Sequence, residues 1–276
     1  MDNLNVFSAD IRKHTLRALL AFGGGHVGGC MSMTEVLAVL YGEVMKIDPT
    51  NPSWEDRDML VVSKGHCGPA VYATLALKGY FPVETLDTLN KEGTILPSHC
   101  DKNLTPGIDM TTGSLGQGIS CAVGLALGLS IKNKDNYVYC ILGDGECDEG
   151  QVWEAALFAS TKKLSNLIVF VDWNKKQLDG FTSDICDLGD VEKKFEDFGF
   201  FAQTVDGHNV TEIISAIDKA KNTTDKPSLI VLDTVKGKDC TFANIPQNHL
   251  IRFGTAEYDD AIAFLDDKIS KLESEL

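Results

Sequence analysis

Short apolar runs, rich in β-branched and aromatic residues, recur along the chain and predict strands. They cover residues 59–62, 137–142, 167–171 and 228–232, and the less apolar segment 201–205 is also expected to be a strand. Between the second and third runs, residues 149–163 carry an apolar helical face, with acidic residues in the first turn and lysines in the last. A strand, a helix and a strand in succession form a βαβ unit, whose two strands are parallel. The pattern therefore predicts an α/β fold.

Helical spacing of apolar residues elsewhere predicts further helices around these strands. A helix over 2–22 ends at a glycine-rich loop, Ser32 or Thr34 is expected to cap the next helix, and an amphipathic helix covers 257–276. No internal repeat, low-complexity tract or linker interrupts the chain. We therefore expect residues 1–276 to form one domain.

Polar residues with metal-binding chemistry follow two neighbouring predicted strands. Gly143-Asp144-Gly145 ends the run at 137–142, and Asn174 follows the run at 167–171. Because parallel strands end at one edge of the sheet, Asp144 and Asn174 should converge there. A carboxylate and an amide oxygen suit Mg²⁺ or Ca²⁺, and the glycines let a phosphate approach the backbone. The pair predicts a metal held on a diphosphate; a tight turn with an Asp cap and an unrelated loop Asn is the alternative.

Other polar segments are predicted at the same edge of the sheet. His66 and Asp206 also follow predicted strands, while His26 lies in the glycine-rich loop at 23–29 and His99 in a long polar loop. A turn alone explains any one such segment, but it explains their combination less well. His208 is expected to brace its own loop rather than to act in catalysis.

Composition and charge narrow the possible ligands. The net charge of −15 makes nucleic acid an unsuitable partner, because little positive charge is available to neutralise phosphates. No apolar run is long enough for a membrane span, and the polar N-terminus lacks signal-peptide features, so we expect a cytoplasmic protein. The eight cysteines form no CxxC pair. A His/Cys zinc site is the less favoured interpretation of the His-Cys pairs, since adjacent residues of an extended segment point to opposite sides.

Several motifs together resemble one enzyme family. GDGECDEGQVWEAALFAS followed by LIVFVDWN resembles the thiamine-diphosphate signature. GGGHVGG, SKGH, TTGSLGQG, VDGHN and TVKGK, in this order, resemble the N-terminal part of transketolase across most of the chain. The resemblance implies a three-layer, doubly wound, mostly parallel sheet with helices on both faces. It also implies thiamine diphosphate with Mg²⁺ (or Ca²⁺), and transfer of a glycolaldehyde unit from a ketose phosphate to an aldose phosphate.

The resemblance also assigns roles by motif. Metal ligands would be Asp144, Asn174 and the backbone carbonyl of Lys176. Cofactor contacts would come from His66, Gly113, Ser114, Leu115, Asp144, Gly145, Asn174 and His249. Catalytic roles would fall to His26, His66, His99 and His249. Glu149 and Glu154 match acids that lie at the family's subunit interface and link paired active sites.

A complete transketolase would continue into a pyrimidine-binding domain and a further C-terminal domain. The resemblance therefore implies that this chain needs a C-terminal transketolase subunit carrying the pyrimidine domain, in a dimer of heterodimers. Two alternatives are an α subunit of a 2-oxo acid dehydrogenase and a non-catalytic protein that binds thiamine diphosphate or a partner. Lys176 departs from the family, which usually has an apolar residue there.

Overall fold

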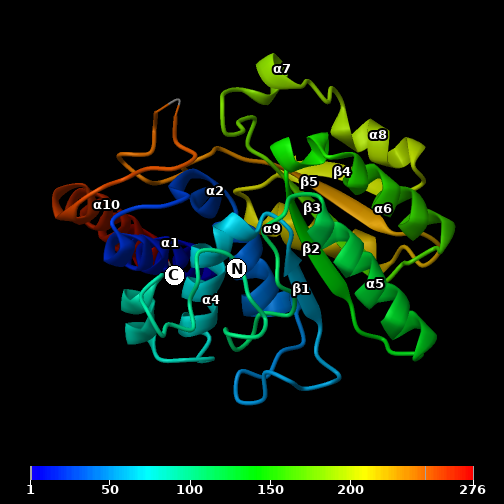
Figure 1. Ribbon diagram of the computed structural model, residues 1–276, viewed down its shortest axis with the longest axis horizontal. Coiled ribbons are helices and arrows are strands. Elements are labelled where there is room, and N and C mark those ends of the chain that lie inside the picture. The colour runs from blue at the N-terminus through cyan, green and yellow to red at the C-terminus, as the bar shows by residue number, and fades with distance from the viewer. Residues whose placement is uncertain (1, 246, 276) are drawn as a thin grey trace.

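The computed structural model describes residues 2–245 and 247–275, so Met1, Pro246 and Leu276 lie outside the described residues. In this part of the chain the strands form a five-stranded sheet in the order β1-β2-β3-β5-β4 (Figure 1). Every neighbouring pair in this sheet is parallel. The strands are β1 Met59–Val62, β2 Val138–Gly143, β3 Leu167–Trp173, β4 Phe201–Asp206 and β5 Ser228–Asp233.

Helices connect the strands, and further helices precede β1 and follow β5 along the chain. The α-helices are α1 Asp2–Phe22, α2 Val27–Ser32, α3 Thr34–Val39, α4 Gly68–Leu77, α5 Gln117–Ile131, α6 Gly150–Thr161, α7 Thr182–Ile185, α8 Val191–Asp197, α9 Val210–Lys221 and α10 Thr255–Ser274. Shorter 3₁₀ or π turns cover Leu40–Val44, Gly65–Cys67, Val83–Thr88 and Gly145–Asp148.

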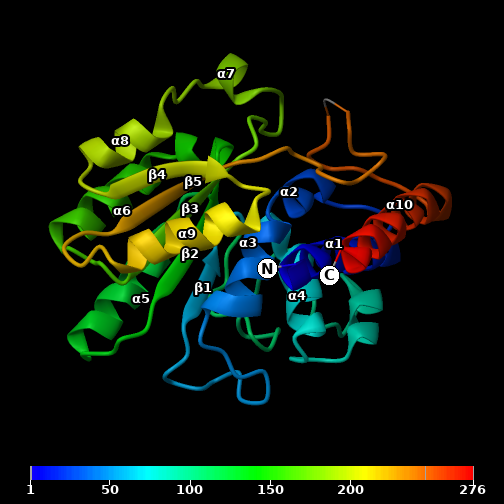
Figure 2. The same cartoon turned by 180° about the vertical axis from the view of Figure 1, so that it is seen from behind.

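The sheet separates two hydrophobic cores. Helices α5, α6 and α8 cover one face, while α1, α3, α4, α9 and α10 lie on the other side (Figures 1 and 2). Along β2, Val138, Cys140 and Leu142 pack into the first core, and Tyr139 and Ile141 pack into the second. Successive strand residues point to opposite faces, so both faces must be apolar. The predicted three-layer fold is confirmed.

The predicted elements agree with the structure apart from their ends and one helix cap. Strand β1 has the predicted bounds, and α6 begins at Gly150, after a 3₁₀ turn at Gly145–Asp148. The expected cap of α3 is wrong: Met33 precedes the helix without a side-chain cap, and the Ser32 hydroxyl instead donates to Asp172. No helix in the described ranges is long and apolar enough to cross a membrane.

The carboxyl ends of the parallel strands bring distant segments together at one edge of the sheet. Strand β1 leads to Ser63 and Lys64, β2 to Asp144, β3 to Asn174 and β5 to Thr234. Because β4 lies at the end of the strand order, Asp206 is separated from β2 by β5 and β3. Asp206 therefore lies at the predicted edge of the sheet, but it lines a separate surface groove rather than the site beside Asp144.

Candidate functional site

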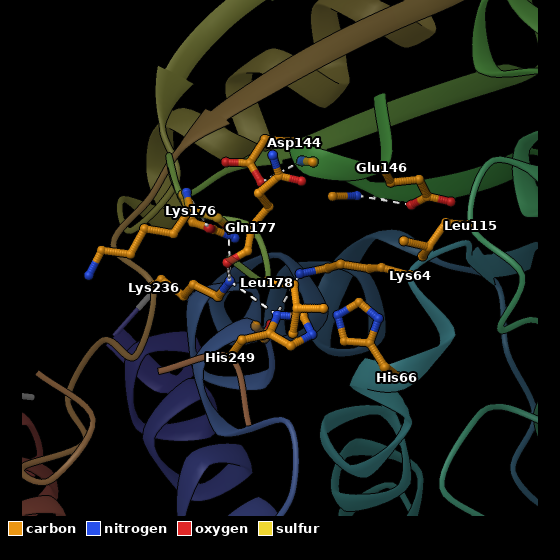
Figure 3. A pocket seen from close by; sticks show the side chains of 14 residues that line it. Lys64, His66, Leu115, Asp144, Glu146, Lys176, Gln177, Leu178, Lys236 and His249 are labelled. Carbon is orange, nitrogen blue, oxygen red and sulfur yellow. Dashed lines mark hydrogen bonds between the residues drawn. The ribbon is translucent and has the colours of Figure 1, made fainter. Parts of the chain in front are cut away.

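A cavity of about 170 Å³ lies at the carboxyl ends of β1, β2 and β3 (Figure 3). Seven predicted site residues line it: His66, Leu115, Asp144, Gly145, Asn174, Lys176 and His249. Lys64, Glu146, Gln177 and Lys236 also line the cavity, although no role was predicted for them. The topology therefore brings the two halves of the predicted Asp144 and Asn174 pair to one cavity.

Asp144 and Asn174 are buried and held by the backbone around them. The Asp144 carboxylate accepts hydrogen bonds from the amides of Gly145 (2.8 Å) and Lys175 (2.5 Å). The Asn174 side-chain oxygen accepts from the Lys176 amide at 3.2 Å, and its nitrogen donates to Asp172 at 2.9 Å. Contacts within and between the segments at the ends of β2 and β3 thus fix both side chains.

The backbone carbonyl of Lys176, predicted as a third metal ligand, faces an ammonium group. Lys236 Nζ donates to this carbonyl at 2.8 Å and lies 3.3 Å from His249 Nδ1. Burial lowers the Lys236 pKa to about 8, with Asp144 acting in the opposite direction. The Lys176 side chain leaves the cavity: its Nζ donates to Ile245 O at 3.4 Å and lies over the Phe181 ring. The unusual lysine therefore connects two loops beside the site.

The donor set fits a hard divalent cation. Burial, followed by the charge of Asp172, raises the Asp144 pKa to about 7, while the Gly145 and Lys175 amides and the charge of Lys236 act in the opposite direction. A bound cation would stabilise its ionised form. Among the described residues, no group of three or more His, Cys, Asp or Glu side chains is arranged to hold a metal. A metal here would therefore also need the Asn174 amide oxygen and a backbone oxygen, which are ligands that suit Mg²⁺ or Ca²⁺.

The four histidines predicted from separate motifs form one cluster. The ring centroid of His26 lies 4.9 Å from that of His66, 5.1 Å from that of His249 and 5.9 Å from that of His99. The rings of His66 and His249 are 5.1 Å apart. His66 and His249 line the cavity itself (Figure 3), and the other two imidazoles extend the cluster away from it.

The environment of this cluster favours neutral imidazoles. Burial, with a smaller effect from His66, lowers the His26 pKa to about 4. Burial and the neighbouring Lys236 lower the His249 pKa to about 3, and burial also lowers the pKa of His99. These three rings are therefore uncharged at neutral pH and can both donate and accept hydrogen bonds.

The remaining predicted residues lie beside the cavity or away from it. Gly113 is next to His99, and Ser114 is exposed in the loop before α5. Glu149 precedes α6 and Glu154 lies on it; both are exposed, and neither lines the cavity. Their expected place at a subunit interface stays a prediction.

Glu146 is a buried carboxylate that sequence reasoning missed. It accepts hydrogen bonds from Ser63 Oγ (2.5 Å), the Gly116 amide (2.8 Å) and the Gly143 amide (3.1 Å). Burial raises its pKa, while these donors act in the opposite direction. Glu146 thus joins the end of β2 to the segment that precedes His66 and to the loop before α5. Its position directly after the Gly-Asp-Gly turn was the available sequence signal.

Asp172 and Lys64 form a second buried polar centre that was also missed. Their side chains are 0% and 2% exposed, and Lys64 Nζ lies 2.5 Å from Asp172 Oδ2. Lys64 Nζ also donates to Gly29 O at 3.1 Å. A buried charge is costly unless it is paired, so a carboxylate at the end of an apolar strand was the signal for such a partner.

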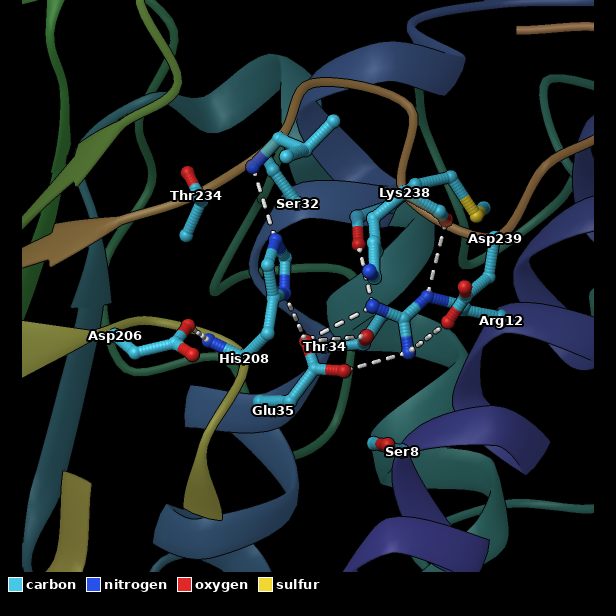
Figure 4. Close-up of polar contacts among 12 residues, drawn as sticks. Ser8, Arg12, Ser32, Thr34, Glu35, Asp206, His208, Thr234, Lys238 and Asp239 are labelled. Atoms are coloured by element: carbon cyan, nitrogen blue, oxygen red, sulfur yellow. Dashed lines mark hydrogen bonds and ion pairs between the residues drawn. The ribbon is translucent and has the colours of Figure 1, made fainter. Parts of the chain in front are cut away.

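His208 braces two loops, as predicted. Its Nε2 accepts from the Val235 amide at 2.9 Å, so its Nδ1 carries the proton and donates to Glu35 Oε2 at 3.1 Å (Figure 4). Glu35 is itself paired with the buried Arg12, whose Nε also donates to Lys238 O at 3.2 Å. This network fixes the backbone on either side of Lys236.

Comparison with known proteins agrees with this geometry. Residues 5–269 match the family described as transketolase, thiamine diphosphate binding domain. The chain is 58% identical to the 6-deoxy-6-sulfo-D-fructose transketolase subunit of a Clostridium species, over 84% of this chain and 85% of that one. It is 34% identical to a subunit of the apulose-4-phosphate transketolase of Phocaeicola vulgatus, over 100% of this chain and 98% of that one.

Solved structures show the same arrangement within longer chains. Transketolase from Leishmania mexicana superposes with a TM-score of 0.86 at 31% identity, covering 99% of this chain and 45% of the other. The present chain therefore spans less than half of that solved transketolase, but most of the length of the two relatives that are named as subunits.

Proposed function

The chain belongs to the transketolase family, as its thiamine diphosphate binding domain, and from this premise we propose that it is the diphosphate-binding subunit of a two-chain transketolase. The main support for this proposal is that Asp144, Asn174 and the histidine cluster lie together at one edge of the sheet. The family match extends along almost the whole chain and does not support a 2-oxo acid dehydrogenase subunit.

A partner chain would complete the enzyme. We expect a C-terminal transketolase subunit carrying the pyrimidine domain, because this chain spans 45% of a solved transketolase and most of the length of two relatives named as subunits. We further propose a dimer of heterodimers, with the exposed Glu149 and Glu154 at the contact between the chains. Such a contact would bury two acids that the isolated chain leaves in water.

Asp144, Asn174 and the carbonyl of Lys176 would hold Mg²⁺ or Ca²⁺, and the metal would bind the cofactor's diphosphate. Lys236 also lines the cavity, and its ammonium group would offset phosphate charge. When bound, thiamine diphosphate supplies the electron sink that makes cleavage next to a ketose carbonyl possible. The protein's task is to hold this group and to exclude competing reactions.

The histidines would act on the sugar. His26, His99 and His249 have lowered pKa values, so their neutral rings can donate hydrogen bonds to a carbonyl or hydroxyl oxygen without bringing positive charge into the cavity. A ring that donates through one nitrogen can also accept a hydroxyl proton through the other. Their close packing would let the cluster contact several hydroxyls of one extended sugar.

For the donor substrate, we propose a ketose with a terminal anionic group. The relative at 58% identity is named for 6-deoxy-6-sulfo-D-fructose, which carries a sulfonate where a sugar phosphate carries its phosphate. We therefore expect the assembled enzyme to use this sulfo-sugar as a two-carbon donor. Fructose 6-phosphate is the matched comparison, because it differs in the terminal anion.

The test is reconstitution. The chain is purified alone and with its candidate C-terminal subunit, and two-carbon transfer to an aldose phosphate is measured with thiamine diphosphate and Mg²⁺. We expect transfer only by the pair. Activity of the isolated chain would contradict the two-chain proposal, and inactivity of every plausible pair would contradict the enzyme proposal.

A second measurement tests the metal site without turnover. Asp144→Ala should abolish Mg²⁺-dependent binding of thiamine diphosphate, because it removes the buried carboxylate from the donor set. Calorimetric titration of the cofactor with and without EDTA measures this dependence. Unchanged Mg²⁺-dependent binding would remove Asp144 from the proposed site.

A further inference from the structure

We propose that Asp172 is a positioning residue that turns the side-chain amide of Asn174 so that its oxygen faces the cofactor cavity; this inference rests on the proposed function. Asp172 lies two positions before Asn174, at the end of β3, and is fully buried. Its Oδ2 accepts from Asn174 Nδ2 at 2.9 Å. Asn174 also lines the cavity beside Asp144.

The chemistry of the two neighbours fixes the direction of the amide. An ionised carboxylate only accepts hydrogen bonds, so Asp172 must meet the nitrogen of the Asn174 side chain. On the other side, the Lys176 amide only donates, and it meets Asn174 Oδ1 at 3.2 Å. Rotation of the amide by 180° would oppose oxygen to oxygen at Asp172 and nitrogen to nitrogen at Lys176. The arrangement therefore selects the rotamer that offers an oxygen, and not an NH₂ group, to a cation.

Asp172 is in turn held by donors from three other segments. Lys64 Nζ (2.5 Å) and Ser32 Oγ (2.6 Å) also donate to Oδ2, and the Thr234 hydroxyl donates to Oδ1. The carboxylate thus has little freedom to turn away from Asn174. Lys64 supplies the positive charge that makes a buried carboxylate tolerable at this position.

The donors come from segments that also carry other cavity residues. Lys64 precedes His66 by two positions, and Thr234 precedes Lys236 by two. Asp172 could therefore stabilise the fold without any special effect on Asn174. A test must separate the orientation of one amide from general support of these loops.

The test uses the full chain with its partner subunit and measures the dissociation constant of Mn²⁺ by electron paramagnetic resonance, in the presence of thiamine diphosphate. Asp172→Asn allows position 172 to present either an oxygen or an NH₂ group to Asn174. We expect it to weaken Mn²⁺ binding by about 10- to 100-fold, the usual cost of losing a partner that orients a metal ligand.

Two further variants keep the proposal falsifiable if Asp172→Asn folds poorly. Thr234→Val removes a donor to Asp172 and leaves the contact with Asn174, so it should change Mn²⁺ affinity by less than about 3-fold while it lowers stability. The exchange Asp172→Asn with Asn174→Asp keeps an amide-to-carboxylate hydrogen bond and leaves an oxygen toward the cavity. It should bind Mn²⁺ more tightly than Asp172→Asn, because a carboxylate at position 174 offers an oxygen in either orientation.

Three outcomes would overturn the inference. They are native affinity in Asp172→Asn, equal weakening by Thr234→Val, and an exchanged variant that binds Mn²⁺ no better than Asp172→Asn. If the native complex bound no Mn²⁺ with thiamine diphosphate, the proposed function itself would fail. The two failures are therefore distinguishable.

Discussion

The ammonium group of Lys236 donates a 2.8 Å hydrogen bond to the backbone carbonyl of Lys176. This contact joins the loop after β5 to the loop after β3, directly beside Asp144 and His249 in the cavity wall. It places a buried positive charge where the sequence alone predicted only a metal ligand. The first lysine of the TVKGK motif thus becomes part of the candidate site.

Lys236→Met should weaken binding of thiamine diphosphate. Hydrogen bonds that involve a charged group contribute roughly 1.5–3 kcal/mol, so we expect a loss of about 10- to 100-fold in affinity. Calorimetric titration with thiamine diphosphate at saturating Mg²⁺ measures this affinity. Lys238→Met is the matched control, because Lys238 lies in the same loop and does not line the cavity. Equal effects of the two substitutions would exclude a specific role for Lys236.

Glu146→Gln should destabilise the chain. The native carboxylate accepts from three donors, which lie after β1, before α5 and at the end of β2. In the variant, an amide replaces one of its two acceptor oxygens with an NH₂ group. We expect a loss of about 1–3 kcal/mol in the free energy of unfolding. Urea titration measures this, with the exposed Glu92→Gln as control. A change no larger than that of the control would contradict the bridging role.

The stability of the chain should depend on pH through His249. Its pKa is about 3 in the folded chain and 6.5 for the free side chain. Below pH 6.5 the unfolded chain therefore gains a proton that the folded chain does not, and folding becomes less favourable as the pH falls toward 3. Above this window both states are uncharged at His249, and the effect disappears.

The measurement compares native chain and His249→Gln by urea unfolding between about pH 5 and 8, without metal. The free energy of unfolding of the native chain, relative to the variant, should decrease in acid by at most about 1.4 kcal/mol per pH unit. Asp144 has a raised pKa and titrates in both proteins, so it cancels from the difference. A difference that stays constant or grows in acid would be incompatible with a depressed pKa at His249.

His208→Ala should cost about 1–3 kcal/mol of stability, because it leaves the Val235 amide and the buried Glu35 without this partner. His208→Gln should lose less, since its side-chain oxygen can still accept from the Val235 amide. Thermal unfolding of both variants gives the comparison. We expect cofactor affinity to fall with the loss of the brace, since Lys236 follows Val235 directly. If His208→Ala and His208→Gln lowered the stability equally, the hydrogen bond to the Val235 amide would not contribute to it.

The sequence by itself determined most strands and the convergence of two potential metal ligands. Apolar runs predicted the strands because a parallel strand covered on both faces must be apolar throughout, and β1 was located to the residue. The βαβ spacing around Asp144 and Asn174 was sufficient to bring them to one edge. Local patterns predict helices and strands because the repeat of apolar positions in each depends only on residues near in sequence.

The strand order and the partners of buried charges were decided only by the tertiary structure. Insertion of β5 between β3 and β4 brings Thr234 to Asp172 and Lys236 to the cavity, and it keeps Asp206 out of the cavity lining. No local pattern encodes that order. Ser32 was one of two predicted helix caps, together with Thr34, but its hydroxyl donates to Asp172, which lies on the distant strand β3. Buried polar groups must find hydrogen-bond partners, and the complete fold decides which distant groups are buried next to each other.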